Sequence, residues 1–289
     1  MSVQELLDMP YNQRRIIVVR DDSPAGVTSG KPVPPVARSV ASFARAYPTV
    51  AFLARASLTV AALVSPTGTL TLAAALTAAD LVRARREMRQ GGENLIPVTS
   101  IEATQLRFPV GHPRRKVAYI GHPVDPPAYI PMADFHRFLF EHKVAEALRL
   151  IRSLGAVTVE VVRVEGWDQT AGVTLGLALP DVSQAEVGVS ASKARASSHL
   201  VLSTMRLKPT QSPWVPKDLV WLPHEPLWQE VAQARLESGL DSFVVDVRST
   251  DDYGVNAGLK ALVAKAGLEA GGAFAEHRNT IWRLQGTFS

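Results

Sequence analysis

The stretch DFHRFLFEHKVAEALRLIRSLG, residues 134–155, and the stretch TVEVVRV that follows it at residues 158–164 decide the fold class. Apolar residues in the first stretch recur every three or four positions, which is typical of a helix with one buried face. This apolar stripe consists of Phe140, Val144, Ala147, Leu148, Ile151 and Leu154. Gly155 is a typical helix stop, and the alternation of valine with charged residues after it indicates a half-buried strand.

Similar patterns elsewhere predict the remaining elements. Short apolar or alternating runs predict strands at residues 16–19, 101–108, 116–120, 173–179, 185–191, 199–207, 243–247 and 273–288. Helical spacing predicts two further helices, at residues 227–238 and 255–266. This order predicts an α+β fold, in which an N-terminal helical hairpin precedes a mixed, mainly antiparallel sheet with packed helices.

Turn-forming residues gather between residues 21 and 35, where four prolines restrict the backbone. We therefore expect three segments along the chain. They are an N-terminal segment and linker over residues 1–35, an apolar helical hairpin over residues 36–92, and an α+β domain over residues 93–289.

The predicted hairpin contains a long uncharged run. No residue between Ala56 and Ala79 is charged, and Pro66 with Gly68 predicts a turn in the middle of this run. The second helix ends in an arginine-rich segment before Gly91-Gly92. Two interpretations stay open. In the first, the hairpin is buried in a soluble fold. In the second, the hairpin inserts into a membrane, because small residues allow close helix packing there and an arginine-rich segment after the hairpin is typical of the cytoplasmic side.

The chain has a formal net charge of +4, and its N-terminal part is the basic one. Residues 1–116 contain 15 Lys and Arg against 8 Asp and Glu. Such a balance suits anionic lipid, nucleic acid or an acidic partner, and charge alone does not choose among these. Under the membrane interpretation, five leucines supply the inserting side and four arginines contact lipid. They are Leu58, Leu63, Leu70, Leu72, Leu76, Arg83, Arg85, Arg86 and Arg89.

Histidines and carboxylates gather between residues 111 and 142, where Gly-His-Pro occurs twice. The histidines are His112, His122, His136 and His142, and Asp125, Asp134 and Glu141 lie among them. His136 and His142 differ by six positions, so a helix turns them about 240° apart, too far to bind one metal together. The chain contains no cysteine, no phosphate-binding glycine loop and no serine elbow. We predict no catalytic residue, no metal site and no cofactor, and interpret these histidines as structural.

A C-terminal motif carries a family resemblance. Asp251-Asp252-Tyr253-Gly254-Val255-Asn256-Ala257-Gly258-Leu259 is followed by Leu262, Ala266-Gly267-Leu268 and Gly271-Gly272-Ala273-Phe274, and an extended run ends at Phe288. This glycine-bracketed helix with a long strand resembles a unit of bacterial gasdermins, which are pore-forming immune proteins. The resemblance covers about 37 of 289 residues. The family's lipidated N-terminal cysteine has no counterpart in this chain. The resemblance implies a membrane-permeabilising activity.

The uncharged run with its basic exit and the C-terminal resemblance favour a pore-forming effector of a bacterial immune or anti-phage system. We expect it to be soluble or autoinhibited until triggered, with membrane lipid as a partner, a homo-oligomer as the assembled form, and nucleic acid or nucleotide as one candidate trigger. Glu5 and Asp8 lie where a secretory signal is basic, which predicts a cytoplasmic protein. Under the membrane interpretation we expect it to associate with the inner membrane. The alternative is a soluble scaffold that oligomerises through its hairpin, or a ligand-sensing α+β domain.

Overall fold

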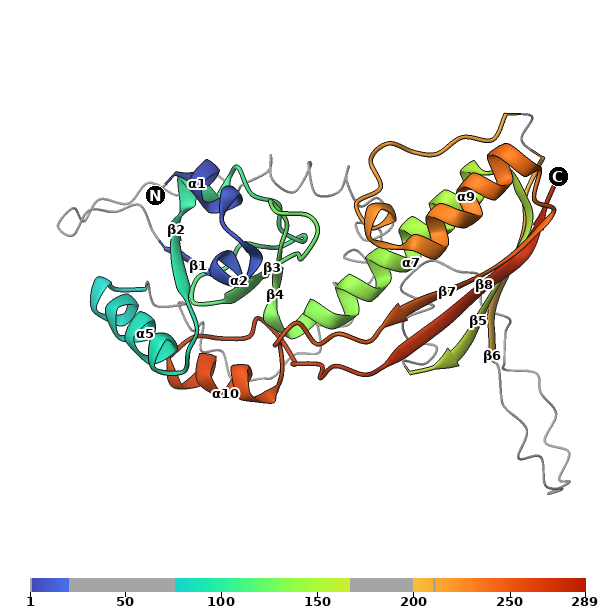
Figure 1. The fold of residues 1–289 in the computed structure, drawn as a ribbon. Coiled ribbons are helices and arrows are strands. Elements are labelled where there is room, and N and C mark those ends of the chain that lie inside the picture. The colour runs from blue at the N-terminus through green and yellow to red at the C-terminus, as the bar shows by residue number, and fades with distance from the viewer. Residues whose placement is uncertain (1, 21–75, 167–199, 210–211) are drawn as a thin grey trace, which may run out of the picture. The chain divides into compact units, whose positions relative to one another are not determined.

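The computed structural model describes residues 2–20, 76–166, 200–209 and 212–289 (Figure 1). The chain divides into two compact units. Unit 1 comprises residues 1–139 and 252–277, and unit 2 comprises residues 140–251 and 278–289. The predicted linker, most of the predicted hairpin, and the strands predicted at 173–179 and 185–191 lie outside the described residues.

Unit 1 contains a four-stranded mixed sheet in the order β2-β1-β3-β4. β1 (Ile16–Arg20) pairs in parallel with β2 (Leu95–Thr99) and antiparallel with β3 (Ala118–Gly121). β4 (Tyr129–Pro131) pairs antiparallel with β3. The first four residues of β1 are buried, as expected for a continuous apolar run in a strand with neighbours on both sides.

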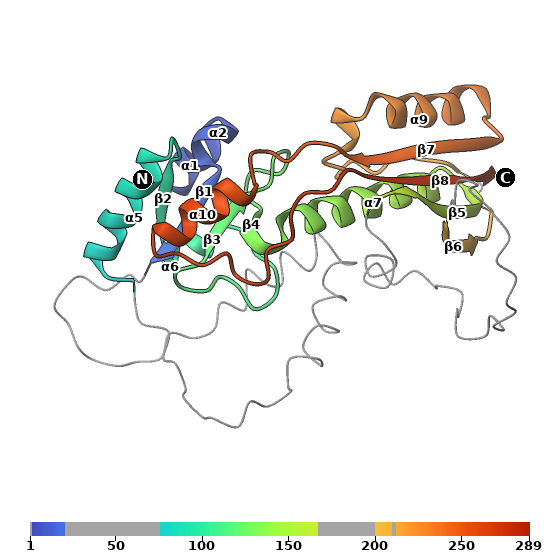
Figure 2. The same cartoon turned by 90° about the horizontal axis from the view of Figure 1, so that it is seen from below.

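Several helices accompany this sheet in unit 1. They are α1 (Val3–Asp8), α2 (Tyr11–Arg14), α5 (Ala78–Gln90), α6 (Ser100–Ala103), the 3-10 helix η1 (Met132–Asp134) and α10 (Ala257–Lys265). Helices α5 and α10 lie side by side in both views (Figures 1 and 2). One core cluster joins α1 to the sheet through Val3, Leu6, Ile17, Val19, Ile96, Val98, Phe108, Tyr119 and Tyr129.

Unit 2 contains an antiparallel four-stranded sheet in the order β6-β5-β8-β7. Its strands are β5 (Ala156–Glu165), β6 (Leu200–Arg206), β7 (Ser242–Ser249) and β8 (Thr280–Phe288). Its helices are α7 (Phe135–Ser153), which begins in unit 1, the 3-10 helix η3 (Leu222–His224) and α9 (Pro226–Ser238). Phe140 of α7 packs edge-on against Trp282 of β8, with ring centroids 5.1 Å apart, and both side chains are buried. This contact joins the predicted helix stripe to the sheet.

The predicted α+β class is confirmed, because helices accompany one mixed and one antiparallel sheet. The predicted helices at 134–154, 227–238 and 255–266 correspond to α7, α9 and α10. The predicted strands at 158–164 and 243–247 correspond to β5 and β7.

The prediction of a strand at residues 101–108 is wrong, because a local cap starts a helix there. The backbone N–H of Glu102 donates to Thr99 Oγ1 (3.2 Å), and the backbone N–H of Thr99 donates to the Glu102 carboxylate (2.8 Å). This reciprocal capping box stabilises the first turn of α6.

The last strand is shorter than predicted, since β8 begins at Thr280 and not at residue 273. The preceding segment bonds to η1 of unit 1 instead of entering a ladder. The backbone N–H of Ala133 donates to the Ala270 carbonyl (2.8 Å), and the N–H of Ala275 donates to the Ala133 carbonyl (3.2 Å). These hydrogen bonds engage backbone groups that would otherwise have to pair with a neighbouring strand if β8 were longer.

Candidate functional site

Helix α5 begins at a hydrogen-bonded cap at the end of the uncharged run. Thr77 Oγ1 accepts from the backbone N–H of Asp80 (3.1 Å), and the Asp80 carboxylate accepts from the backbone N–H of Thr77 (3.1 Å). Hydrogen bonds from the Thr77 side chain and backbone lower the pKa of Asp80. The cap therefore fixes the start of the helix at Ala78, inside the uncharged run. The Asp80 carboxylate, the first of the helix, is engaged in this cap.

Helix α5 ends at the predicted glycine pair. Gly92 has a φ of 82°, in the left-handed region that favours glycine. The N–H of Glu93 donates to the Met88 carbonyl (2.9 Å), and the N–H of Gly92 donates to the Arg89 carbonyl (3.0 Å). These are the two hydrogen bonds of a Schellman motif. The predicted stop at Gly91-Gly92 is confirmed.

One side of α5 is anchored in unit 1. Ala84 and Met88 are buried. On the flank of the helix, the Glu87 carboxylate forms an ion pair with Lys265 of α10 at 2.9 Å. The hydrogen bond from Lys265 is the main cause of the lowered pKa of Glu87. The second carboxylate of α5 is therefore also engaged, and the rotation of the helix about its axis is set.

The opposite side of α5 faces solvent and is basic. Val82 is 70% exposed, and Arg83, Arg86 and Arg89 are all exposed. Arg86 and Arg89 follow Val82 by four and seven positions, so they share one side of the helix with it. We call Val82, Arg83, Arg86 and Arg89 the arginine face. Two hollows run along this surface, and the described residues that line them all belong to α5.

The guanidinium groups of α5 differ from several others in their pairing. Within residues 76–166 and the other described ranges, no carboxylate forms an ion pair with Arg83, Arg85, Arg86 or Arg89. By contrast, six arginines elsewhere in the described ranges each pair with a carboxylate, and one of these pairs joins Arg248 to Asp246. The other five are Arg15 with Glu93, Arg107 with Asp125, Arg137 with Asp134, Arg149 with Asp218 and Arg283 with Asp246. The arginine face thus offers planar donor forks suited to phosphate or carboxylate groups.

The structure brings together the four arginines predicted as lipid contacts. Three of them belong to the arginine face, and Arg85 is half-buried at its flank. Leu76 is half-buried just before the Thr77 cap. The other predicted contacts, Leu58, Leu63, Leu70 and Leu72, lie outside the described residues.

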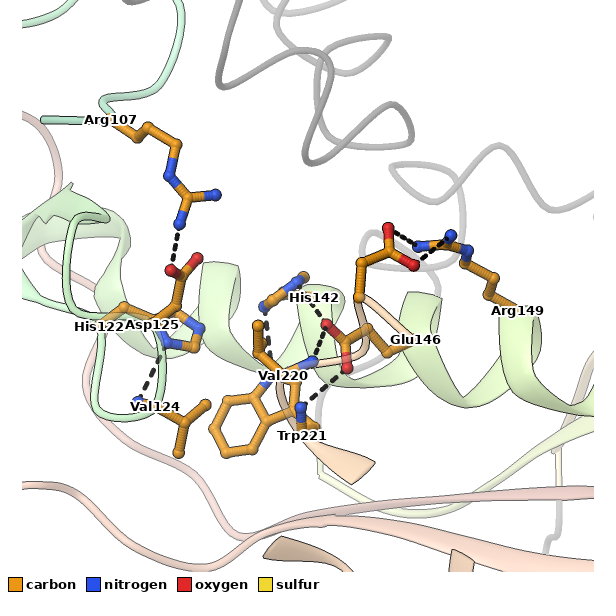
Figure 3. A network of polar contacts seen from close by, with 10 residues as sticks. Arg107, His122, Val124, Asp125, His142, Glu146, Arg149, Val220 and Trp221 are labelled. Atoms are coloured by element: carbon orange, nitrogen blue, oxygen red, sulfur yellow. Dashed lines mark hydrogen bonds and ion pairs between the residues drawn. The ribbon is translucent and has the colours of Figure 1, made fainter. Parts of the chain in front are cut away.

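Three of the predicted structural histidines lie in unit 1, and one of them, His136, is buried with its Nε2 atom 2.5 Å from the Val255 carbonyl oxygen. His112 Nδ1 lies 2.6 Å from the Tyr119 hydroxyl, and burial, with a smaller contribution from Arg114, lowers the pKa of His112 to about 4. His122 is fully buried, and its Nδ1 accepts from the backbone N–H of Val124 (3.3 Å; Figure 3). Among the residues placed by the structure, no group of three or more His, Asp or Glu side chains is arranged to hold a metal ion.

His142 belongs to a buried network in unit 2 (Figure 3). The Trp221 indole N–H donates to His142 Nδ1 (3.1 Å), and His142 Nε2 lies 3.2 Å from the Glu146 carboxylate. That carboxylate also accepts from the backbone N–H groups of Val220 (3.0 Å) and Trp221 (2.9 Å). Both ring nitrogens are engaged by groups of the chain itself. The network therefore anchors the segment around Trp221 to α7.

Sequence reasoning missed the exposed valine of the arginine face and the network around His142. A helical projection of residues 78–90 places Val82 beside Arg86 and Arg89, so that signal was present. The i,i+4 spacing of His142 and Glu146 was also visible. Trp221 follows His142 by 79 positions, and no pattern in the sequence connects them.

Comparisons with protein-family models, with curated proteins and with solved structures each give no match. For the described ranges, no helix has both the length and the apolar character needed to cross a bilayer.

Proposed function

We propose that this chain acts at an anionic membrane surface, which it contacts through the arginine face of α5. The observation that carries the proposal is the combination of three exposed arginines and one exposed valine on a single helix side. The anchored side of α5 points Ala84 and Met88 into unit 1. The opposite side is therefore presented outward without unfolding of the unit.

The expected energetics are sufficient for reversible binding. Each arginine near an anionic leaflet contributes about 1 kcal/mol, so three contribute about 3 kcal/mol at physiological ionic strength. Transfer of an exposed valine into the interfacial region adds about 1 kcal/mol. Such binding weakens steeply with salt, because exposed charges are screened beyond about 8 Å at 0.15 M ionic strength.

The position of α5 in the chain supports a second part of the proposal. The uncharged run from Ala56 leads directly into the capped start of α5, so docking of the arginine face brings that run to the same surface. We propose that Leu58, Leu63, Leu70, Leu72 and Leu76 then enter the apolar layer and that an oligomer permeabilises the bilayer. A role as a triggered bacterial immune effector at the inner membrane follows from the C-terminal gasdermin resemblance.

Vesicle flotation of the full chain tests the surface contact. Binding to vesicles of neutral phosphatidylcholine is compared with binding to vesicles that contain about a third phosphatidylglycerol, an anionic lipid. Each arginine near the anionic surface contributes about 1 kcal/mol to binding. The variant Arg83→Gln/Arg86→Gln/Arg89→Gln should bind the anionic vesicles about 100-fold more weakly than the wild type. The matched control is Arg152→Gln/Arg206→Gln/Arg278→Gln, which removes the same charge from exposed sites in unit 2. Equal binding of the two triple variants contradicts the proposal.

A deletion tests the second part separately. Because α5 packs in unit 1, the deletion should remove residues 36–75 and leave α5 in place. We expect this variant to bind anionic vesicles but to release no encapsulated dye, whereas the triggered full chain binds and releases dye. Dye release by the deletion variant would refute the role of the uncharged run and leave surface binding intact.

A further inference from the structure

Strand β7 forms one edge of the antiparallel sheet in unit 2 (Figure 1). Its eight residues pair with β8 in one uninterrupted register, from Ser242 opposite Thr287 to Ser249 opposite Thr280. Natural edge strands are commonly interrupted by a bulge, a proline or a lysine, which discourages pairing with another chain. β7 contains no bulge, no proline and no lysine.

The backbone hydrogen bonds of β7 alternate between β8 and the open edge. The backbone N–H of Phe288 donates to the Asp241 carbonyl (2.8 Å), so the odd-numbered residues that follow in β7 bond toward β8. The backbone N–H of Thr287, which lies opposite Ser242, donates instead to Thr158 Oγ1 of β5 (3.0 Å). The even-numbered residues of β7 therefore direct their N–H and C=O groups away from β8.

Three successive positions of this edge are open. They are Ser242, Val244 and Asp246, and within the described ranges no hydrogen bond reaches their backbone N–H and C=O groups. At the next even-numbered position, the Arg248 carbonyl accepts from Lys143 Nζ of α7 (3.0 Å). The open part of the edge therefore comprises residues 242–246, and Lys143 closes the edge beyond it.

Helix α9 covers one face of β7. The Arg235 guanidinium of α9 lies 4.8 Å from the centroid of the Phe288 ring, and this ring contacts Phe243 of β7 with centroids 4.9 Å apart. Phe243 is buried, whereas Val244, which points to the opposite face, is 62% exposed. An exposed valine beside open backbone groups is typical of a strand that pairs with another strand.

The open part of the edge is complementary to a second copy of itself. If two β7 strands pair antiparallel about a twofold axis at Val244, the two valines lie opposite each other. Ser242 of each copy then lies opposite Asp246 of the other copy. The valine pair is a favourable cross-strand contact, and the serine hydroxyl can donate to the carboxylate. In this register, the open backbone groups of one strand bond to the open backbone groups of the other.

The charge of Asp246 is compatible with this register. Its carboxylate already accepts from Arg283 (2.8 Å) and Arg248 (3.3 Å) of its own chain. An axis at Asp246 would place two carboxylates opposite each other, which is unfavourable. An axis at Val245 would bring Arg248, whose carbonyl is already engaged by α7, into the ladder. The axis at Val244 avoids both problems.

We propose that β7 is a homodimer interface, at which two copies of the chain join edge to edge and extend the sheet of unit 2 into one continuous sheet. The partner is a second copy of this chain, because the open positions satisfy one another only in a self-complementary register. The dimer needs no membrane, so it does not depend on the contact proposed for the arginine face. Its tests contain no lipid, and their outcome is therefore independent of the vesicle experiments.

Sedimentation equilibrium of the full chain tests the interface. Small interfaces are weak, so the measurement covers about 1–500 µM, and the wild type should pass from monomer to dimer over this range. Val244→Lys places two lysines opposite each other at the axis and should raise the dissociation constant at least about 30-fold. The matched control Ile101→Lys, at a 68% exposed position on α6, should leave the dissociation constant unchanged. A monomeric wild type, or equal dissociation constants for the two variants, overturns the proposal.

Val244→Pro is a second variant that adds no charge. Proline removes the outward N–H at the axis, while the hydrogen bonds to β8, which run through the odd-numbered residues, remain. Loss of one backbone hydrogen bond from each copy should also raise the dissociation constant about 30-fold. A Val244→Pro dimer as stable as that of the wild type contradicts pairing through this edge.

Amide exchange within β7, followed by NMR, identifies what covers the edge. The amides of Val245 and Val247 donate toward β8 and should be protected at every concentration, whereas those of Val244 and Asp246 should gain protection as the dimer forms. For a dissociation constant of about 10 µM, this gain is about fivefold between about 10 and 500 µM. Protection of Val244 that does not depend on concentration shows that another part of the same chain covers the edge, and overturns the second copy as its partner.

Discussion

Gly91, at the end of α5, lies directly against Leu262 of α10: a Cβ atom added to Gly91 would be 2.4 Å from Leu262 Cδ2. The φ of Gly91 is −84°, so its backbone accepts any residue, and only the close contact requires glycine. The arginine face is thus held in position by a steric fit at one end of its helix.

Gly91→Ala should therefore loosen α5 from α10. Overpacking of this kind costs about 1 kcal/mol, at the low end of the usual range, because the end of the half-buried Leu262 side chain must shift. Urea unfolding measures the change in the free energy of unfolding, and hydrogen exchange locates it in residues 78–90. Gly272→Ala is the matched control, since its Cβ meets Ala133 at an ordinary 3.4 Å. Equal stability of the two variants would show that the fit does not anchor the helix.

Val82→Ser separates membrane contact from folding. Val82 is 70% exposed, so its replacement should change the free energy of unfolding by less than about 0.5 kcal/mol. If Val82 enters the lipid interface, the same change should weaken flotation with anionic vesicles about fivefold, for a loss of about 1 kcal/mol. Ile101→Ser, at a 68% exposed position on α6, is the control and should leave flotation unchanged. Similar losses for both variants would indicate a nonspecific effect of surface hydrophobicity.

Elements with a strong local pattern could be predicted from the sequence, and elements decided by longer-range contacts could not. The apolar stripe of α7 and the glycine pair after α5 are local signals, and both predictions are confirmed. The start of β8 depends instead on Ala270 and Ala275 bonding to Ala133, far away in sequence. The parallel pairing of β1 with β2 likewise joins residues on either side of a long intervening segment.

The candidate site was predictable in composition but not in orientation. The arginines between residues 83 and 89 are plain in the sequence. Which of them face solvent depends on the burial of Ala84 and Met88 against unit 1. Neither residue is distinctive as a core residue by itself, since alanine and methionine occur on both surfaces of helices. The packing of unit 1 therefore decides which side of α5 is presented.

Glu146→Gln tests the network that anchors Trp221 to α7. Glu146 is 7% exposed and accepts two backbone N–H groups while facing His142. Glutamine has one side-chain oxygen and places an NH₂ group where the second carboxylate oxygen was. One of the two backbone N–H groups, of Val220 or Trp221, then loses its acceptor. We expect a loss of about 1–3 kcal/mol in the free energy of unfolding, measured with urea and followed by tryptophan fluorescence. Glu237→Gln, at an exposed position of α9, should change stability by less than about 0.5 kcal/mol.

The lowered pKa of His112 predicts a pH dependence of stability that one substitution removes. Burial holds this pKa at about 4 in the folded protein, whereas an unfolded histidine titrates near 6.5. Between these values the unfolded state binds more protons, so stability is fully present above pH 6.5 and is lost as the pH falls toward 4.

The test compares urea unfolding at pH 7.5 and 4.5. The wild type should lose roughly 2 kcal/mol more than His112→Asn, because asparagine leaves a polar group near the Tyr119 hydroxyl but does not titrate. The exposed-site control His224→Asn should show the full wild-type loss. Other groups that titrate in this range contribute equally to all three proteins, so the difference isolates His112. An identical loss of stability in His112→Asn and the wild type would mean that folding does not lower the pKa of His112.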